Sequence, residues 1–148
     1  MPTTFIGLSS TRFGGETKQV ECNSSGLKEG AVVVWDSTNA GQLVKAPTGA
    51  GGTGVAGVIC NAQVSGGTSV GDSVDVQFTG IANVLLDATE AVTVGQRVIV
   101  SDTDGSVKAA TGDQVDYIGV ALITKTAGSA NELIPVALNI QYVGDAVP

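Results

Sequence analysis

The chain has 148 residues, a length typical of one β domain with a substantial apolar core. Fourteen acidic against seven basic side chains give a net charge of −7, which argues against nucleic acid or an anionic membrane as the main partner. The sequence contains no histidine, which excludes Ser-His-Asp and Cys-His catalysis and every metal site that needs an imidazole.

The first segment along the chain, residues 1–24, shows little strand alternation but is rich in large apolar side chains. These are Phe5, Ile6, Leu8 and Phe13. A disordered tail is usually poorer in such groups, so we expect an extended N-terminal arm that reaches a neighbouring subunit. The alternative is that this segment supplies an edge strand to its own sheet, and the sequence leaves both open.

From Leu27 onward, short Val-rich runs separated by Gly, Asn, Asp and Ser predict a series of strands. The expected strands cover about 31–36, 42–46, 55–62, 73–79, 81–86, 96–101, 106–110, 116–124 and 134–142. Val74, Val76 and Phe78 alternate with Asp75 and Gln77, which indicates a strand with one face toward solvent. One short helix is expected near residues 87–92, with Asp87 as its N-cap.

Two parts of the chain repeat each other. Gly30 begins a Val-rich run that ends in an Asp-containing turn, and the same pattern starts again 65 residues later at Gly95. Gly57-Val58 is likewise matched by Gly119-Val120. We therefore predict a compact all-β barrel over residues 25–148 with an internal two-fold repeat, its copies covering about 27–80 and 92–142.

Motifs that would indicate chemistry fail on their context. The run Gly49–Gly54 has the spacing of a dinucleotide-binding loop but leads into an expected strand, not into a helix whose N-terminus would face a phosphate. Asp102, Asp104 and Asp113 resemble calcium-loop ligands, but Gly105 comes too early and no glutamate closes the loop. No catalytic, cofactor-binding or metal-ligating residue is predicted, and we do not expect an enzyme.

Cysteine content and the N-terminal sequence bear on where the protein is made. Cys22 and Cys60 are too few and too widely separated for a disulfide framework or a metal knuckle. Residues 1–5 lack the basic head and apolar run of a secretory signal, and no stretch is long and apolar enough to span a membrane. Synthesis in the cytoplasm is therefore expected.

Several segments together resemble the capsid cement, or head decoration, proteins of tailed bacteriophages. The resemblance covers roughly residues 27–142 and rests on short apolar, glycine-based motifs. The motifs are Gly54–Val58, Gly71–Gly80, Val94–Val98, Ser101–Gly105, Tyr117–Ala121 and Ile134–Asn139.

This resemblance implies a fold and a role. The fold would be a compact β-barrel or β-tulip with an arm, here residues 1–24. The role would be that of a homotrimer on the outside of the phage head, where it clamps major capsid protein subunits and binds neither nucleic acid, membrane nor a small-molecule substrate. The partner-interface residues expected from the arm and the first repeat are Phe5, Ile6, Leu8, Arg12, Phe13 and Trp35. Trp35 is alternatively a core or barrel-rim aromatic.

Two other functions fit parts of the sequence. A carbohydrate- or surface-binding β module would need an exposed aromatic platform, for which the body of the chain offers Trp35, Tyr117 and Tyr142. A small trimeric nucleotide hydrolase would need a phosphate-cradling helix end and metal-binding carboxylates, and the sequence shows neither.

Overall fold

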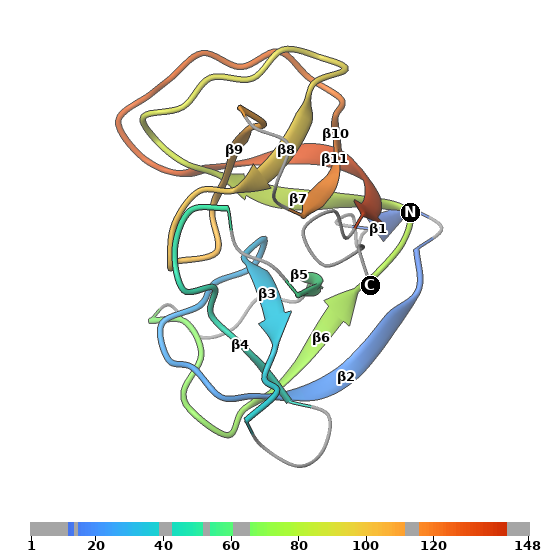
Figure 1. Cartoon of the computed structure of the whole chain (residues 1–148), viewed down its shortest axis with the longest axis vertical. Helices are drawn as coiled ribbons and strands as arrows, with labels where there is room; N and C mark the ends of the chain where they lie inside the picture. Colours follow the sequence, from blue (N-terminus) through green and yellow to red (C-terminus); the bar gives the residue numbers. More distant parts are fainter. Residues whose placement is uncertain are drawn as a thin grey trace, which may run out of the picture.

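The computed structural model describes residues 12–13, 15–38, 43–51, 54–60, 66–111 and 116–141. Within these residues it consists of strands joined by turns and loops, and it contains no helix (Figure 1). The strands are β1 (Arg12–Phe13), β2 (Thr17–Cys22), β3 (Val32–Trp35), β4 (Leu43–Lys45), β5 (Val55–Ile59), β6 (Ser73–Gln77), β7 (Ile81–Leu86), β8 (Arg97–Val100), β9 (Val107–Ala109), β10 (Tyr117–Ala121) and β11 (Glu132–Gln141).

The strands form two layers of similar design. The first is a closed barrel in the order β2-β4-β3-β5-β6, and the second is a sheet in the order β1-β7-β11-β10-β8-β9. An additional pairing between β7 and β9 closes five strands of the second sheet into a ring. Figure 1 shows this second ring above the first barrel.

The first barrel and the second ring share one pairing scheme. In the first barrel, β2 pairs in parallel with β4 and antiparallel with β6, and β3 pairs with β4 and β5. In the second ring, β7 likewise pairs in parallel with β9 and antiparallel with β11, and β8 pairs with β9 and β10. Gly57 and Gly119, which the repeat in the sequence aligns, occupy equivalent positions. Three residue pairs of the first barrel have equivalents in the second ring: Val33–Gly57 corresponds to Val98–Gly119, Trp35–Val44 to Val100–Val107, and Val58–Gln77 to Val120–Ala137.

The turns that precede β3 and β8 also repeat. Gly30 and Gly95 have φ angles of 88° and 90°, a backbone conformation that favours glycine. Their N–H groups donate to the carbonyls of Ile59 and Ala121, each at 2.8 Å, which are the equivalent last residues of β5 and β10. We call residues 28–31 the first turn and residues 93–96 the second turn.

Two clusters of buried aliphatic side chains make up the core. One fills the first barrel and is built mainly from valine together with Leu27 and Ile59. The other lies between the two layers and joins Val32, Val34, Val55 and Val58 of the first barrel to side chains of β7, β8, β10 and β11. Because this second cluster takes side chains from both layers, neither layer buries its apolar face without the other.

The strands expected from Leu27 onward all appear in the structure as β3 to β11, with ends shifted by a few residues. The helix expected near residues 87–92 is wrong. The Asp87 carboxylate instead accepts hydrogen bonds from the N–H and hydroxyl of Thr89, each at 3.0 Å, which makes a single turn. Three residues later, Val92 forms an isolated bridge with Lys125, so the backbone is paired before a second helical turn can form.

The described part of the segment 1–24 supplies strands. β1 pairs with the start of β7, and β2 forms one wall of the first barrel, with Val20 and Cys22 buried. From Arg12 onward the segment therefore contributes to the body of the molecule. Residues 1–11 lie outside the described part of the chain.

Candidate interaction surface

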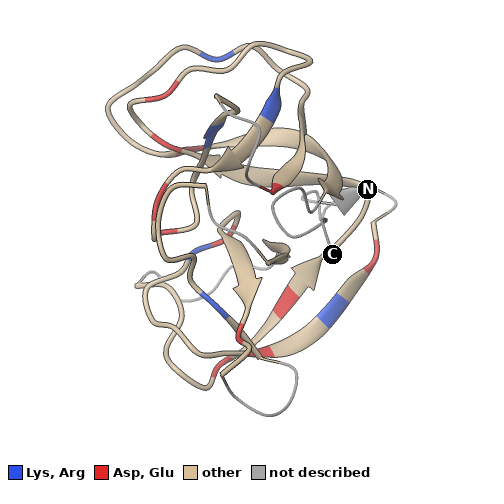
Figure 2. Ribbon diagram, viewed as in Figure 1, with Lys and Arg blue, Asp and Glu red and all other residues tan. Residues whose placement is uncertain are grey.

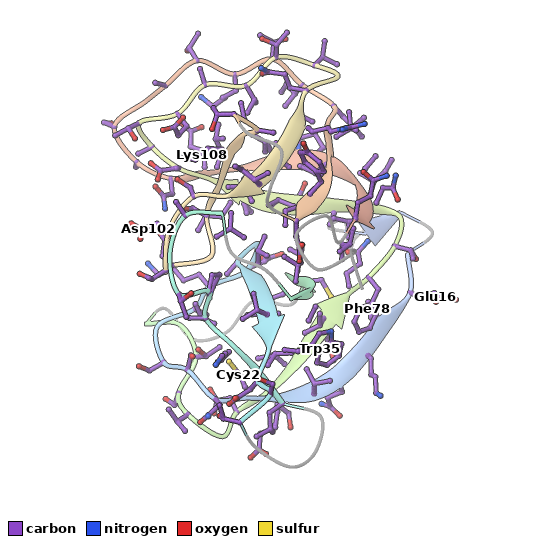
Figure 3. The ribbon with its side chains drawn as sticks, viewed as in Figure 1. Glu16, Cys22, Trp35, Phe78, Asp102 and Lys108 are labelled. Atoms are coloured by element: carbon purple, nitrogen blue, oxygen red, sulfur yellow. The ribbon has the colours of Figure 1, made fainter. Side chains whose placement is uncertain are left out.

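An aromatic pair with one exposed and one partly buried ring lies at the end of the first barrel. Trp35, the last residue of β3, keeps 39% of its surface exposed and stacks against Phe78, which directly follows β6. The ring centroids are 6.4 Å apart and the ring planes differ by 17° (Figure 3). We call Trp35 and Phe78 the aromatic pair.

The strand end that carries Trp35 is held rigidly by the next residue, Asp36. The buried Asp36 carboxylate accepts hydrogen bonds from the Asn23 side-chain amide at 2.8 Å and from the Thr38 hydroxyl at 2.6 Å. Lys45 lies 3.7 Å away and forms an ion pair with the same carboxylate. Trp35 is therefore presented from a fixed backbone, which lowers the entropy that binding a partner would cost.

Phe78 is fixed where the chain passes from the first barrel to the second ring. Its N–H donates to the Glu16 carbonyl at 2.9 Å. The adjacent Gln77 is fully buried, and its amide nitrogen donates to the carbonyls of Thr79 and Ile81 at 2.8 and 3.1 Å. The expectation that Gln77 faces solvent is therefore wrong, because its side chain satisfies backbone carbonyls in the connection between the two layers.

The predicted interface residues are distributed as follows. Phe5, Ile6 and Leu8 lie outside the described residues. Arg12 and Phe13 form β1 and pair with Ala82 and Ile81 of β7. Trp35 belongs to the aromatic pair. No sequence pattern connects Phe78 to Trp35, although the alternation of Val74, Val76 and Phe78 predicts that the Phe78 ring lies on the inward face of its strand.

A groove of about 450 Å³ opens at the junction between the two layers. The described residues that line the groove include the apolar side chain of Leu85 and the polar side chains of Lys28, Asp104 and Asn131. The Asn131 amide donates to the Asp104 carboxylate at 2.9 Å and accepts the Ala88 N–H at 2.9 Å. These groups are engaged in holding the loops around the groove together.

Two carboxylates near this junction, Glu29 and Asp87, have shifted pKa values. Burial raises the pKa of Glu29 above its ordinary value, because the charged form loses water. The pKa of Asp87 is lowered by the hydrogen bonds from the Thr89 N–H and the Ser101 hydroxyl.

The charged side chains of the described residues are spread over both layers. In Figure 2 the Lys and Arg residues stand apart from one another among more numerous Asp and Glu residues. No group of three or more His, Cys, Asp or Glu side chains in the described ranges is arranged to hold a metal ion. Within the same ranges, no helix has the length and apolar character needed to cross a membrane.

The chain matches a protein family and solved structures of known proteins. A family model described as the XM1 gp53 minor capsid protein matches residues 7–138. Among solved structures, the chain is similar to the N base of the head fiber gp8.5 of bacteriophage phi29, with a TM-score of 0.54 and 12% sequence identity. That match covers 84% of this chain and 94% of the phi29 chain, and at this identity it shows a shared fold. No curated protein sequence matched.

Proposed function

The chain belongs to the family of the XM1 gp53 minor capsid protein, and from this premise we propose that it binds the outer surface of a phage head and clamps major capsid protein subunits together. Membership makes it a structural, capsid-associated phage protein of the virion, in agreement with the resemblance to phage head proteins. The position on the outer surface and the identity of the capsid subunit are parts of the proposal.

The observation that carries the proposal is the aromatic pair on a rigid strand end. Aromatic side chains dominate the binding energy of protein interfaces, and burying one contributes about 1.5 to 3 kcal/mol. Trp35 is exposed and stacked on Phe78, and Asp36 fixes its backbone. A capsid surface that covers Trp35 gains the part of this energy that belongs to its exposed 39%, with little ordering cost.

The N-terminal arm supplies the second part of the proposed contact. Phe5, Ile6 and Leu8 precede β1, and we propose that they lie across a neighbouring subunit, with Arg12 and Phe13 at the base of the arm. Each apolar side chain that becomes buried there adds about as much as one residue of the aromatic pair, less the cost of ordering the arm.

Assembly as a homotrimer would multiply these contacts. Three copies that bind one site on a capsid act together, because each contact after the first forms at a high effective concentration. A closed trimer also fits the symmetry that oligomers of identical chains usually adopt. The mass of the protein in solution, measured by light scattering, tests this part separately.

The proposed function is tested by cosedimentation with phage heads that lack the protein. We expect the full chain to bind, the Trp35→Ala variant to bind at least tenfold more weakly, and a variant without residues 1–11 to lose binding. Val70→Ala is the matched control, because Val70 is 65% exposed and lies outside the aromatic pair. If the full chain does not cosediment with heads, or if Trp35→Ala and Val70→Ala bind equally well, the proposal is wrong.

One observation favours a second candidate function. The exposed face of Trp35 offers the kind of aromatic surface on which sugar rings stack, as a carbohydrate-binding β module requires. Calorimetric titration with host cell-surface oligosaccharides tests this candidate. Binding that is lost in Trp35→Ala, without any binding to heads, would favour it over capsid attachment.

A further inference from the structure

The first turn, residues 28–31, packs against strands of the second ring and so gives an example of a surface that a turn of this kind contacts. Gly30 of this turn lies against the β7–β11 pair of the second ring. Its carbonyl accepts the Leu85 N–H at 2.9 Å. A side chain at residue 30 would collide with Leu133 and would approach the backbone of Asn83 and Leu85 to within 3.2 and 3.1 Å. The first turn is thus docked on a sheet edge that presents two leucines.

The second turn, which is equivalent, has no such neighbour among the residues that the structure describes. A Cβ atom built on Gly95 meets nothing within 4 Å. The segments that lead into β8 and out of β10 lie at the upper end of the molecule in Figure 1, opposite the first barrel. Three large apolar side chains are exposed here: Val94 at 58%, Leu122 at 41% and Ile123 at 40%. We call these three residues the apical patch.

At the turns, one pair of equivalent residues is the reverse of what solvent exposure predicts. Val94 of the exposed second turn corresponds to Glu29 of the docked first turn, and Leu122, which follows β10, corresponds to Cys60, which follows β5. The covered position therefore holds an acid, whose pKa is raised by burial, while the exposed position holds a valine. Exposed apolar groups that cluster in this way mark an interaction site.

The apical patch is held in place before any partner binds. The Val94 N–H donates to the Thr124 hydroxyl at 3.1 Å, and Val92 and Lys125 exchange two backbone hydrogen bonds of 2.9 Å. The Lys125 ammonium is paired with Glu132 at 3.2 Å, so the positive charge beside the patch is neutralised. A partner for this surface is consequently apolar and needs no net charge.

We propose that the apical patch docks on an uncharged, aliphatic sheet edge of a capsid protein, in the way that the first turn docks on Leu85 and Leu133. This inference rests on the proposed function for the identity of the partner. A second copy of this chain does not offer a free matching edge, because the Leu85 N–H on that edge already donates to the copy's own Gly30 carbonyl, although the Leu133 side chain keeps 43% of its surface exposed. The equivalent pair in the first barrel is Glu21–Ser73, which is polar.

The experiment compares variants of the full chain for binding to heads. We expect the double substitution Leu122→Ser with Ile123→Ser to weaken cosedimentation at least tenfold, and Val70→Ser, the exposed control, to leave it within twofold. Val94→Thr keeps the shape of the side chain and replaces a methyl by a hydroxyl, so it tests the patch even if the double variant folds poorly. We expect it to weaken binding several-fold without changing the urea midpoint of unfolding.

A photo-crosslinking amino acid at position 122, used on the assembled particle, identifies the partner by mass spectrometry. A crosslink to an aliphatic strand of a capsid protein supports the proposal, and a crosslink to a second copy of this chain overturns it. If Val94→Thr and the double variant bind fully while Trp35→Ala fails to bind, the proposed role of the apical patch is wrong and the proposed function still holds. Failure of the unaltered chain to bind heads overturns both.

Discussion

At the scale of single residues, two glycines at one position of the repeat leave no room for a side chain between neighbouring strands. A Cβ atom on Gly57 would collide with the carbonyl of Gln77 and the side chain of Val76, and one on Gly119 would collide with the carbonyl of Ala137. Neither glycine has a positive φ, so their role is to let two strands approach each other, not to form a turn.

We therefore predict that Gly57→Ala and Gly119→Ala each lower the free energy of unfolding by at least about 2 kcal/mol, because the added methyl group forces neighbouring backbone apart. Gly66→Ala is the control, since a Cβ at residue 66 meets nothing within 4 Å and the residue does not have a positive φ. Urea unfolding measures all three. Equal stability of Gly57→Ala and Gly66→Ala would contradict the role assigned to the glycine pair.

At the scale of the strand and turn, much of the fold could be predicted from the sequence. Valine alternation and glycine spacing located β3 to β11 and aligned Gly30 with Gly95 and Gly57 with Gly119, because both signals report local backbone geometry. The Asp87 turn was misread as a helix, because its capping bond to Thr89 is the same in a helix and in an isolated turn.

Contacts that form only in the folded structure decided what sequence patterns could not. The polar character of Gln77 predicts exposure, whereas its side chain is buried because it reaches carbonyls two and four residues further along the chain. The two equivalent turns share their glycine, and only the packing of the layers shows that Gly30 is covered and that Gly95 has no described neighbour. The aromatic pair likewise joins residues from β3 and from the end of β6, which local patterns do not connect.

The first turn also carries a testable pH dependence at Glu29. The raised pKa of Glu29 means that the folded state binds its proton more tightly than the unfolded state does. Stability is therefore lost as the pH rises from the unfolded pKa through the folded one, and the loss is complete above the folded pKa. We predict that Glu29→Gln is more stable than the unaltered chain at pH 7 and equally stable at about pH 3.5.

Urea midpoints at the two pH values measure the difference. An equal gain in stability at both pH values would show that the amide packs better than the acid, and would contradict the assignment of the effect to ionisation. A loss of stability at pH 7 would contradict it as well.

At the scale of the whole molecule, the two layers form one body. The shared cluster of aliphatic side chains lies between them, and the buried Asp116 carboxylate accepts the N–H groups of Gly54 and Val55 at 2.7 and 3.3 Å. Gly54 and Asp116 precede the equivalent strands β5 and β10, so the repeats are tied together at matching positions. A body joined in this way holds the aromatic pair and the apical patch at a fixed separation, as the proposed clamping of capsid subunits requires.

The chemistry of these two surfaces predicts how attachment responds to salt. Both are apolar, and the charges beside them are paired within the chain, as in Asp36 with Lys45 and Lys125 with Glu132. Salt screens interactions between exposed charges but leaves the burial of apolar surface intact. We therefore predict that the affinity for phage heads changes less than about threefold between 50 mM and 500 mM NaCl.

Because the chain carries a net charge of −7, attachment to a basic capsid surface would instead weaken steeply over the same range. Cosedimentation at a series of salt concentrations separates the two cases, and a tenfold loss at high salt would show that charge, not the aromatic pair and the apical patch, holds the protein on the head.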